Sequence, residues 1–218
     1  MTAPISDTAN AADDSSPLQE VTRAQFLKLF TAVCFPMFLG ASDQMLLATA
    51  TPSIAADFGD LHNTSWIMTA YLLAGAVTVT VYGRLGDKFG RREVLLLALG
   101  LFLLGAVLCG LAPTLNWLIF GRTVQGVGGG GLISLCLALI GELVPPRQRA
   151  AFQGYFSAVF TSANILGPIL GGMVVAHFSW RWLFAAYLPL GALAAWRIST
   201  LPRGRRNPQA PGVSDATG

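Results

Sequence analysis

The chain has 218 residues, of which 53% are hydrophobic and only 11% are charged, whereas roughly 25% are charged in a typical soluble domain. The charged residues stand in short groups between long apolar runs, as they do where membrane-spanning helices alternate with loops. Composition therefore excludes a soluble globular domain. The net charge of +3 leaves nucleic-acid binding and membrane orientation to be decided from the positions of the basic residues.

The two ends of the chain differ from its middle in composition. Residues 1–25 are rich in Ala, Asp, Ser and Thr and lack an apolar core, so we expect a disordered cytoplasmic tail rather than a signal peptide. Residues 203–218 are expected to form a second cytoplasmic tail, which is basic and rich in Pro and Gly. The folded part predicted between them, residues 26–202, is a six-helix transmembrane domain.

Six segments carry the roughly 20 apolar residues that a helix needs to cross a bilayer. Their apolarity is continuous rather than one-sided, which indicates burial in lipid and in a bundle. The sequence therefore predicts an all-α membrane protein. The predicted spans are 29–51, 66–82, 94–111, 116–140, 152–176 and 183–199.

The basic residues predict how these spans are oriented. Twelve Lys and Arg residues fall on the side of the N-terminus, Arg181 alone falls on the opposite side, and Arg122 lies within a span. Cytoplasmic loops carry such an excess of positive charge. We therefore expect both termini in the cytoplasm and no nucleic-acid partner.

The three cysteines, Cys34, Cys109 and Cys136, each stand alone in an apolar run. Neither a CxxC pair nor a histidine at ligand spacing accompanies them, so neither a disulfide framework nor a metal site is predicted. We expect all three to be buried as small apolar side chains.

The first span contains an acidic residue, Asp43, and the fourth contains Arg122 followed three residues later by Gln125. An ionisable residue in hydrocarbon indicates a functional site, because its charge is costly there. The alternatives are a hydrated Asp43 near the outer rim and an Arg122 that reaches the outer surface. At 1.5 Å per residue, Asp43 lies ~21 Å above the inner end of its span. Arg122 lies ~9 Å below the outer end of its span, which in a ~30 Å hydrocarbon core is also ~21 Å from the inside. We therefore predict that Asp43 and Arg122 face the same cavity.

The segment between the second and third spans, residues 83–93, reads GRLGDKFGRRE. Its glycines suit a tight cytoplasmic loop in which two helix ends approach closely. Asp87 is expected just before the third helix, where a carboxylate accepts N–H bonds and favours the helix dipole. An ordinary positive-inside loop would explain the charges, but not the ordered alternation of Gly, Asp and basic residues.

Glycines also mark the fourth and fifth spans. Gly126 and Gly130 should let another helix approach the fourth, and the GxGxxG match at residues 126–131 lacks the βαβ context of a dinucleotide site. In the fifth span, Pro168 should kink the helix, while Gly167 and Gly171 form a GxxxG contact face. A kinked packing helix without a role in transport remains an alternative.

Together these motifs resemble the major facilitator superfamily. The first span is similar to the LDxTIVxxALPxIaaDlg pattern of its fourteen-helix drug:proton antiporters, the EmrB/QacA type, with Asp43 and Pro52 matched. The fourth span resembles the R-x-x-Q-G motif. The signature G-x-L-a-D-r-x-G-r-r/k is matched at Gly83, Leu85, Asp87, Lys88, Gly90, Arg91 and Arg92. The antiporter motif G-P-x-x-G-G is matched at Gly167, Pro168, Gly171 and Gly172.

The chain also departs from this family pattern. Met45-Leu46-Leu47 replaces the usual Thr-Ile-Val of the first span, and Tyr187 stands where F-x-x-N-x-P-x-G has Asn. The second departure should alter packing or the wall of the cavity.

The resemblance covers residues 26–202 and implies the N-terminal half of the transporter, built from two inverted three-helix repeats. It implies exchange of protons for lipophilic, often cationic drugs, driven by the proton gradient without a cofactor, and so a transporter rather than an enzyme. Asp43, Arg122 and Gln125 would couple protons. Residues 83–92 would form a cytoplasmic latch between the two halves, and residues 167–172 the antiport helix.

Because alternating access needs two bundles, several functional interpretations stay open. The first is a truncated N-terminal half that is inactive by itself. The second is a half-transporter that acts as a homodimer or with a separate C-terminal half. The third is a non-transporting membrane protein that modulates full-length relatives.

Overall fold

The computed structural model describes residues 23–60, 62–144 and 146–201, and almost all of them are α-helical. Every predicted apolar segment is a helix, which confirms the all-α fold. In chain order the helices are α1 (Arg23–Phe58), α2 (Ser65–Phe89), α3 (Arg91–Gly110), α4 (Leu115–Leu143), α5 (Pro146–His177) and α6 (Arg181–Ser199).

Five of the described helices, α1 to α5, contain stretches long and apolar enough to cross a membrane. The sixth, α6, has 19 residues and carries Arg181 at its start and Arg197 in its last turn, which lowers its hydropathy. The expected tails lie outside the described residues, except that α1 begins at Arg23.

Several helices continue beyond the predicted apolar segments. α2 runs on from the predicted end at 82 to Phe89, and α5 begins at Pro146 rather than at 152. Helical hydrogen bonding continues into the polar ends of these segments, whereas hydropathy reports only the part that would lie in hydrocarbon.

Hydroxyl side chains inside α1 are satisfied within the helix itself. Ser42 donates to the carbonyl of Phe38 at 2.7 Å, and Thr51 donates to that of Leu47 at 2.8 Å. Such bonds to the preceding turn let an apolar helix carry polar residues without unpaired groups in lipid.

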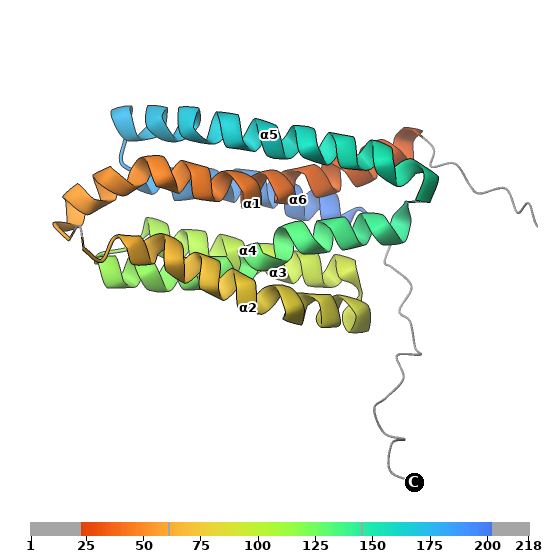
Figure 1. Cartoon of the computed structure of the whole chain (residues 1–218), viewed down its shortest axis with the longest axis horizontal. Helices are drawn as coiled ribbons and strands as arrows, with labels where there is room; N and C mark the ends of the chain where they lie inside the picture. Colours follow the sequence, from red (N-terminus) through yellow and green to blue (C-terminus); the bar gives the residue numbers. More distant parts are fainter. Residues whose placement is uncertain (1–22, 61, 145, 202–218) are drawn as a thin grey trace, which may run out of the picture.

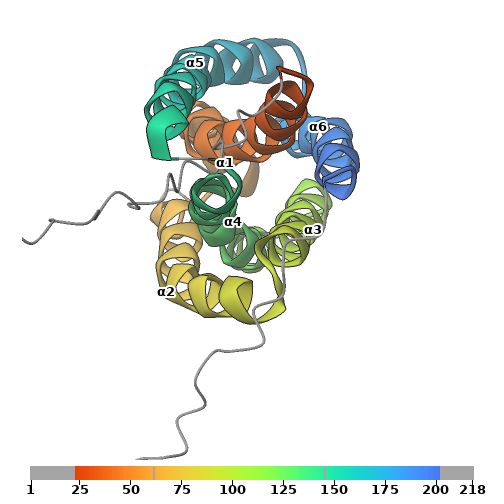
Figure 2. The ribbon, with the colours of Figure 1, turned by 90° about the vertical axis from the view of Figure 1, so that its right-hand side faces the viewer.

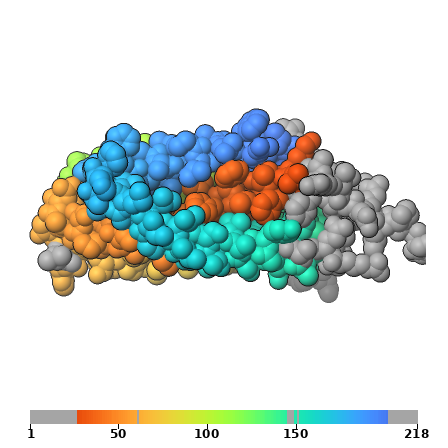
Figure 3. All heavy atoms as spheres, turned by 90° about the horizontal axis from the view of Figure 1, so that it is seen from above, coloured from red at the N-terminus to blue at the C-terminus, as the bar shows by residue number. Residues whose placement is uncertain are grey.

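The six helices form two rows that face each other (Figures 1 and 2). In one row α1 packs against α5 and α6, and in the other α4 packs against α2 and α3, while α3 meets α6 and α1 meets α4. Figure 3 shows α1 lying between α5 and α6 along the bundle. Because α2 packs on α4 as α5 packs on α1, the helices α1–α3 and α4–α6 form two inverted three-helix repeats.

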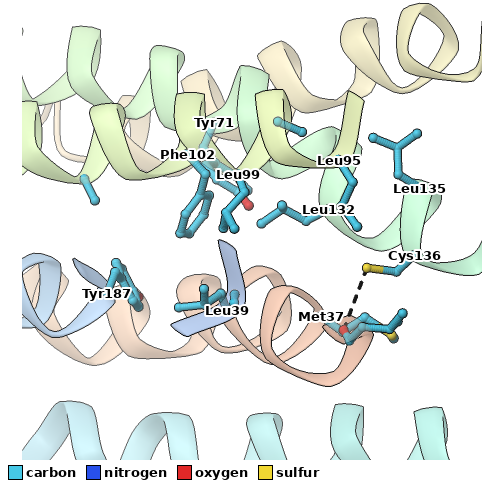
Figure 4. Close-up of a cluster of buried hydrophobic side chains, with 14 of the residues drawn as sticks. Met37, Leu39, Tyr71, Leu95, Leu99, Phe102, Leu132, Leu135, Cys136 and Tyr187 are labelled. Atoms are coloured by element: carbon cyan, nitrogen blue, oxygen red, sulfur yellow. Dashed lines mark hydrogen bonds between the residues drawn. The ribbon is translucent and has the colours of Figure 1, made fainter. Parts of the chain in front are cut away.

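Apolar side chains fill the space between the two rows (Figure 4). Leu39 of α1, Leu99 and Phe102 of α3, and Leu132 of α4 are all almost completely buried. Cys109 and Cys136 are buried as expected, whereas Cys34 is partly exposed. This interface holds α1 and α4 together at the centre of the bundle.

Glycines on α4 allow the second row to pack closely. A Cβ atom on Gly126 would lie 2.8 Å from the Cα of Tyr71 in α2, and one on Gly128 would lie 2.8 Å from the Cα of Phe102 in α3. Such distances are too short for any side chain, so backbone meets backbone on two sides of α4. This confirms that the glycine-rich segment is a close-packing helix face.

The turn between α2 and α3 is shorter than the predicted loop. α2 continues to Phe89, α3 begins at Arg91, and Gly90 alone separates them with φ of 97°. Glycine adopts this backbone conformation without the steric penalty of a side chain. The prediction of a loop over residues 83–93 is therefore wrong, because a single left-handed glycine reverses the chain.

Candidate functional site

A polar cluster lies in the apolar core between α1 and α4. Asp43 is 1% exposed, and Arg122 and Gln125 are each 0% exposed. Among the described residues, Arg122 is the largest side chain that is fully buried. Since Arg and Asp are almost never fully buried unless paired, the cluster must satisfy its own charges.

Arg122 binds both other members of the cluster. Its Nη1 donates to the two carboxylate oxygens of Asp43 at 3.0 and 2.9 Å and to Oε1 of Gln125 at 2.7 Å. Gln125 Nε2 donates to Asp43 at 3.1 Å, which closes a triangle of side chains. The predicted pairing of Asp43 with Arg122 is therefore confirmed. Both alternatives, a hydrated Asp43 and an Arg122 that reaches the surface, are excluded.

The expected cavity around these residues is closed. Each member of the cluster is packed by its neighbours and shielded from solvent, so the pair lies in a dry interior rather than on the wall of an open chamber. Close packing of α3 against α4 helps to exclude solvent, because a Cβ atom on Gly105 of α3 would lie 2.5 Å from the Cβ of Gln125.

Two tyrosines enclose the cluster. The Cζ of Arg122 lies 4.3 Å from the centroid of the Tyr71 ring, in a cation–π arrangement. Tyr187 of α6 is the second, and it is 3% exposed. Tyr187 also packs against Phe102, with ring centroids 5.6 Å apart (Figure 4). The residue that departs from the family pattern therefore belongs to the site.

One donor of the cluster has no hydrogen-bond partner among the described residues. The Nη2 atom of Arg122 is buried and makes no hydrogen bond, although Nε points to the carbonyl of Ile67 at 3.4 Å. Breaking a buried ion pair by removing one partner typically costs about 3–5 kcal/mol, because the other charge is left uncompensated. Neutralisation of Asp43 would therefore leave Arg122 strained in its present position.

The end of α2 and the start of α3 are held to α4 by Arg91. This side chain donates to the carbonyl of Ala138, lies 3.3 Å from Asp87 and lies 3.7 Å from Glu142. Asp87 itself is within α2 and 70% exposed. The prediction that Asp87 precedes α3 and caps it is therefore wrong. Gly90 occupies the cap position, and Glu93 is the acidic residue of the first turn.

Other members of the predicted latch have different surroundings. Arg92 donates to the carbonyls of Ile198 and Ser199 at 3.0 and 2.5 Å, which caps the end of α6. Gly83 has open space around its Cα, whereas a Cβ on Gly86 would meet Leu135 of α4 at 3.3 Å.

The glycines of α5 pack on α1 beside the polar cluster. A Cβ on Gly167 would lie 2.9 Å from that of Met45, and one on Gly171 would collide with Thr49 and lie 3.1 Å from the carbonyl oxygen of Leu46. This confirms the predicted GxxxG contact face. Gly172 faces open space, and α5 continues as a helix through Pro168.

A second polar cluster, at the opposite end of the bundle from Arg91, was not predicted. Asp57 of α1 accepts hydrogen bonds from Trp180 Nε1 at 3.0 Å and from Arg181 Nη1 at 3.1 Å. Arg181 Nη2 also donates to the carbonyl of Ala112 at 3.1 Å. These residues tie the ends of α1, α3 and α6 together. The signal in the sequence was the lone basic residue on this side, but a partner so distant along the chain could not be inferred from it.

The fold defines a multi-pass membrane protein. The family model "Major Facilitator Superfamily" matches residues 33–217, which is most of the chain. The chain therefore belongs to the major facilitator superfamily.

Relatives with recorded names agree with this assignment. The chain is 36% identical over 186 residues to "Multidrug resistance protein 3" of Bacillus subtilis, covering 85% of this chain and 36% of that protein. It is 38% identical over 178 residues to "Multidrug transporter protein MdtP" of the same organism, covering 82% and 33%. The chain thus spans about a third of the length of these relatives.

Solved structures share the fold at lower identity. The bundle matches the crystal structure of a D-xylose-proton symporter with a TM-score of 0.69 and 20% identity, covering 83% of this chain and 49% of that one. The human organic anion transporter MFSD10 matches with a TM-score of 0.62 and 21% identity, covering 81% and 48%. The six helices therefore have the fold of one half of such a transporter.

Proposed function

We propose that the chain is the N-terminal half of a proton-coupled antiporter that exports lipophilic drugs, of the fourteen-helix EmrB/QacA type. The observation that carries the proposal is the dry contact of Asp43 with Arg122 at 2.9 Å. An acidic group held in hydrocarbon by one arginine can exist with or without a proton, and the two forms bind that arginine differently.

The geometry of the cluster supports this proposal. A proton on Asp43 removes the negative charge that holds Arg122, and the guanidinium then needs another partner. Gly167 and Gly171 place α5 directly against the segment of α1 that carries Asp43. A shift of α1 caused by protonation would therefore move α5 along a smooth surface, and the binding cavity with it.

The names of the relatives support drug export, since two Bacillus proteins are described as multidrug transporters. Their greater length supports the view that this chain acts with a second bundle. The partner would be a separate C-terminal half or a second copy. The exposed apolar faces of α2 and α5, which include Leu73, Val77, Ile169 and Met173, are suited to such a partner.

The orientation proposed is a bacterial inner-membrane protein with both termini in the cytoplasm. In Figure 1 the start of α1, the turn between α2 and α3 and the start of α5 lie at one end of the bundle, and the start of α6 lies at the other. By sequence, Lys28, Arg84, Arg91 and Arg149 belong to the first group of helix ends and Arg181 to the start of α6. This distribution supports a cytoplasmic location for the first end.

Proton release on drug binding tests the proposal. The purified chain in lipid nanodiscs should release protons into weakly buffered solution when a lipophilic drug binds, and Asp43→Asn should abolish the release. Asp60→Asn is the matched control, because Asp60 lies between α1 and α2, where its carboxylate accepts hydrogen bonds from Asn63 rather than from an arginine. Equal proton release from wild type and Asp43→Asn would refute proton coupling through this site.

A further inference from the structure

A pocket of about 380 Å³ lies between α1, α4 and α5, apart from the ion pair. Its walls combine apolar side chains with uncharged polar ones. The apolar residues are Met37, Leu137, Phe156 and Phe160, and the polar residues are Gln153, Ser157 and Thr161.

The pocket is close to the coupling site and on the same helices. Met37 precedes Asp43 by six residues on α1, which places it ~9 Å away along the helix axis. On α5, Phe156 and Phe160 are four residues apart, and so are Ser157 and Thr161. Such spacing gives two parallel rows on one helix face. The row of aromatic rings therefore lies beside a row of hydroxyl groups.

Its walls contain no charged residue, and the nearby carboxylates are occupied. Within the described residues of α1, α4 and α5, the acidic side chains are Asp43, Asp57 and Glu142. These lie 2.9, 3.1 and 3.7 Å from Arg122, Arg181 and Arg91, respectively. Each carboxylate already has an arginine, so none is free to bind an organic cation.

A positive charge lies one helix turn from the pocket. Arg149 donates to the carbonyls of Val144 and Gly141, at 3.0 and 2.6 Å. Gly141 is one turn beyond Leu137 on α4, and Arg149 is one turn before Gln153 on α5. The guanidinium therefore disfavours a second cation nearby.

The balance of these effects disfavours cationic ligands in the pocket. A cation that leaves water for an apolar site loses far more hydration free energy than the faces of two phenylalanine rings return. An uncharged aromatic compound loses little hydration free energy there and gains ring contacts. Its polar groups can form hydrogen bonds with Gln153, Ser157 and Thr161.

We propose that this pocket is the substrate-contact site of the chain and that it binds uncharged aromatic amphiphiles in preference to organic cations. The proposal rests on the proposed function, since a transporter supplies the reason for a ligand site beside the coupling pair. It narrows the substrate from lipophilic drugs in general to neutral ring compounds that carry hydrogen-bonding groups.

A matched pair of dyes tests the charge preference directly. Nile red and Nile blue share a benzophenoxazine ring system, but the first is neutral and the second is a cation at neutral pH. Binding of each dye to the purified chain in nanodiscs would be measured by fluorescence titration, with empty nanodiscs subtracted. Wild type should bind Nile red at least about tenfold more tightly than Nile blue.

Variants then assign the binding to the pocket. Phe160→Ala should weaken Nile red about tenfold through the lost ring contact, whereas Leu166→Ala, an exposed position of α5 outside the pocket, should leave it unchanged. Ser157→Asp should strengthen Nile blue binding by supplying a free carboxylate, and Ser157→Asn should not. Ser157 is exposed, so neither substitution places a larger side chain in a buried position.

Two results would overturn the proposal. Wild type could bind Nile blue as tightly as Nile red, with both weakened by Phe160→Ala, in which case the pocket does not select against cations. Alternatively, Nile red binding could be insensitive to Phe160→Ala and Nile blue binding to Ser157→Asp, in which case the pocket is not the site. Because neither dye measurement involves protons, these failures are distinguishable from a failure of proton coupling at Asp43.

Discussion

Two ion pairs of the same chemistry occupy opposite environments in this molecule. Arg122 and Asp43 lie 2.9 Å apart and are almost completely buried, while Arg181 and Asp57 lie 3.1 Å apart with side chains that are 38% and 51% exposed. Their distances are nearly equal, so the geometry alone would assign them similar energies. Their different surroundings, however, give the two pairs different energies.

Water makes the difference between the two pairs. An exposed pair gains little because solvent screens both charges, and each partner is hydrated when the other is removed. In the buried pair, removal of one charge strands the other in a medium that cannot solvate it. Loss of one charge therefore disturbs the buried pair far more than the exposed pair, which ties helix ends together.

The largest predicted effect comes from breaking the buried pair. Arg122→Gln should destabilise the chain by about 3–5 kcal/mol, because Asp43 keeps its burial and loses its cation. Thermal unfolding in detergent, followed by circular dichroism at a pH where Asp43 is ionised in wild type, measures this loss. The Arg181→Gln variant serves as the exposed counterpart. Equal losses for the two variants would contradict the comparison.

Close packing around the buried pair predicts the next effect. Gly126→Ala should cost about 1–3 kcal/mol, because its Cβ would press on the backbone of Tyr71. Gly141→Ala, on the same helix with open space around it, should be neutral or slightly stabilising, since alanine favours helix more than glycine. The same unfolding measurement compares them, and a harmless Gly126→Ala would refute the close approach of α2 to α4.

The contact of α5 with α1 predicts a smaller difference between two adjacent glycines. Gly171→Ala should cost about 1 kcal/mol, at the low end of overpacking, because the colliding Thr49 hydroxyl can rotate away. Gly172→Ala faces open space and should cost nothing measurable. Unfolding gives the stability, and proton release on drug binding gives the coupling. Only Gly171→Ala should slow the release, so identical kinetics in both variants would argue against movement at this contact.

The exposed pair predicts a weaker effect. Arg181→Gln should reduce stability by about 0.2–1 kcal/mol, the usual range for a solvent-exposed ion pair. High salt should remove most of that difference, whereas it should leave the effect of Arg122→Gln nearly unchanged. A salt titration of the unfolding temperature separates the two pairs, and a salt-independent effect at Arg181 would mean that its hydrogen bonds, rather than its charge, hold α6.

The smallest effect is expected in the turn after α1. Hydrogen bonds from the side chain and backbone of Asn63 lower the pKa of Asp60 below its ordinary value. A depressed carboxyl pKa stabilises the fold above the ordinary value, and this contribution is lost as the pH falls through the lowered one. Asn63→Ala should therefore raise the pKa of Asp60, as NMR titration of the labelled carboxyl would report. An unchanged pKa would show that the turn does not hold this carboxylate.

The sequence was sufficient to predict the helices and the shared level of Asp43 and Arg122. Hydropathy identifies apolar segments, and a constant rise per residue converts the positions of Asp43 and Arg122 into a common level. The same reasoning found the glycine faces of α4 and α5, because small residues at a spacing of four mark a helix contact regardless of the partner.

What the sequence could not predict depends on contacts between distant segments. Tyr71 and Tyr187 enclose the pair only because α2 and α6 pack where they do. Asp57 similarly binds Arg181, which lies more than a hundred residues later in the sequence. The misplaced loop at Gly90 has a local cause, since hydropathy falls several residues before helical hydrogen bonding ends. The cavity expected around Asp43 and Arg122 is closed in the structure. Packing of the surrounding helices, rather than the presence of charge, decides whether water reaches these residues.

A double-mutant cycle on Asp43 and Arg122 tests the central claim most directly. The unfolding free energies of Asp43→Asn, Arg122→Gln and the double variant would be compared with that of wild type in the same detergent. The account predicts a coupling energy of about 2–3 kcal/mol, with the double variant no less stable than Arg122→Gln alone. Losses that add to within about 0.5 kcal/mol would show that the two side chains act independently, and the buried ion pair could not then be the coupling element.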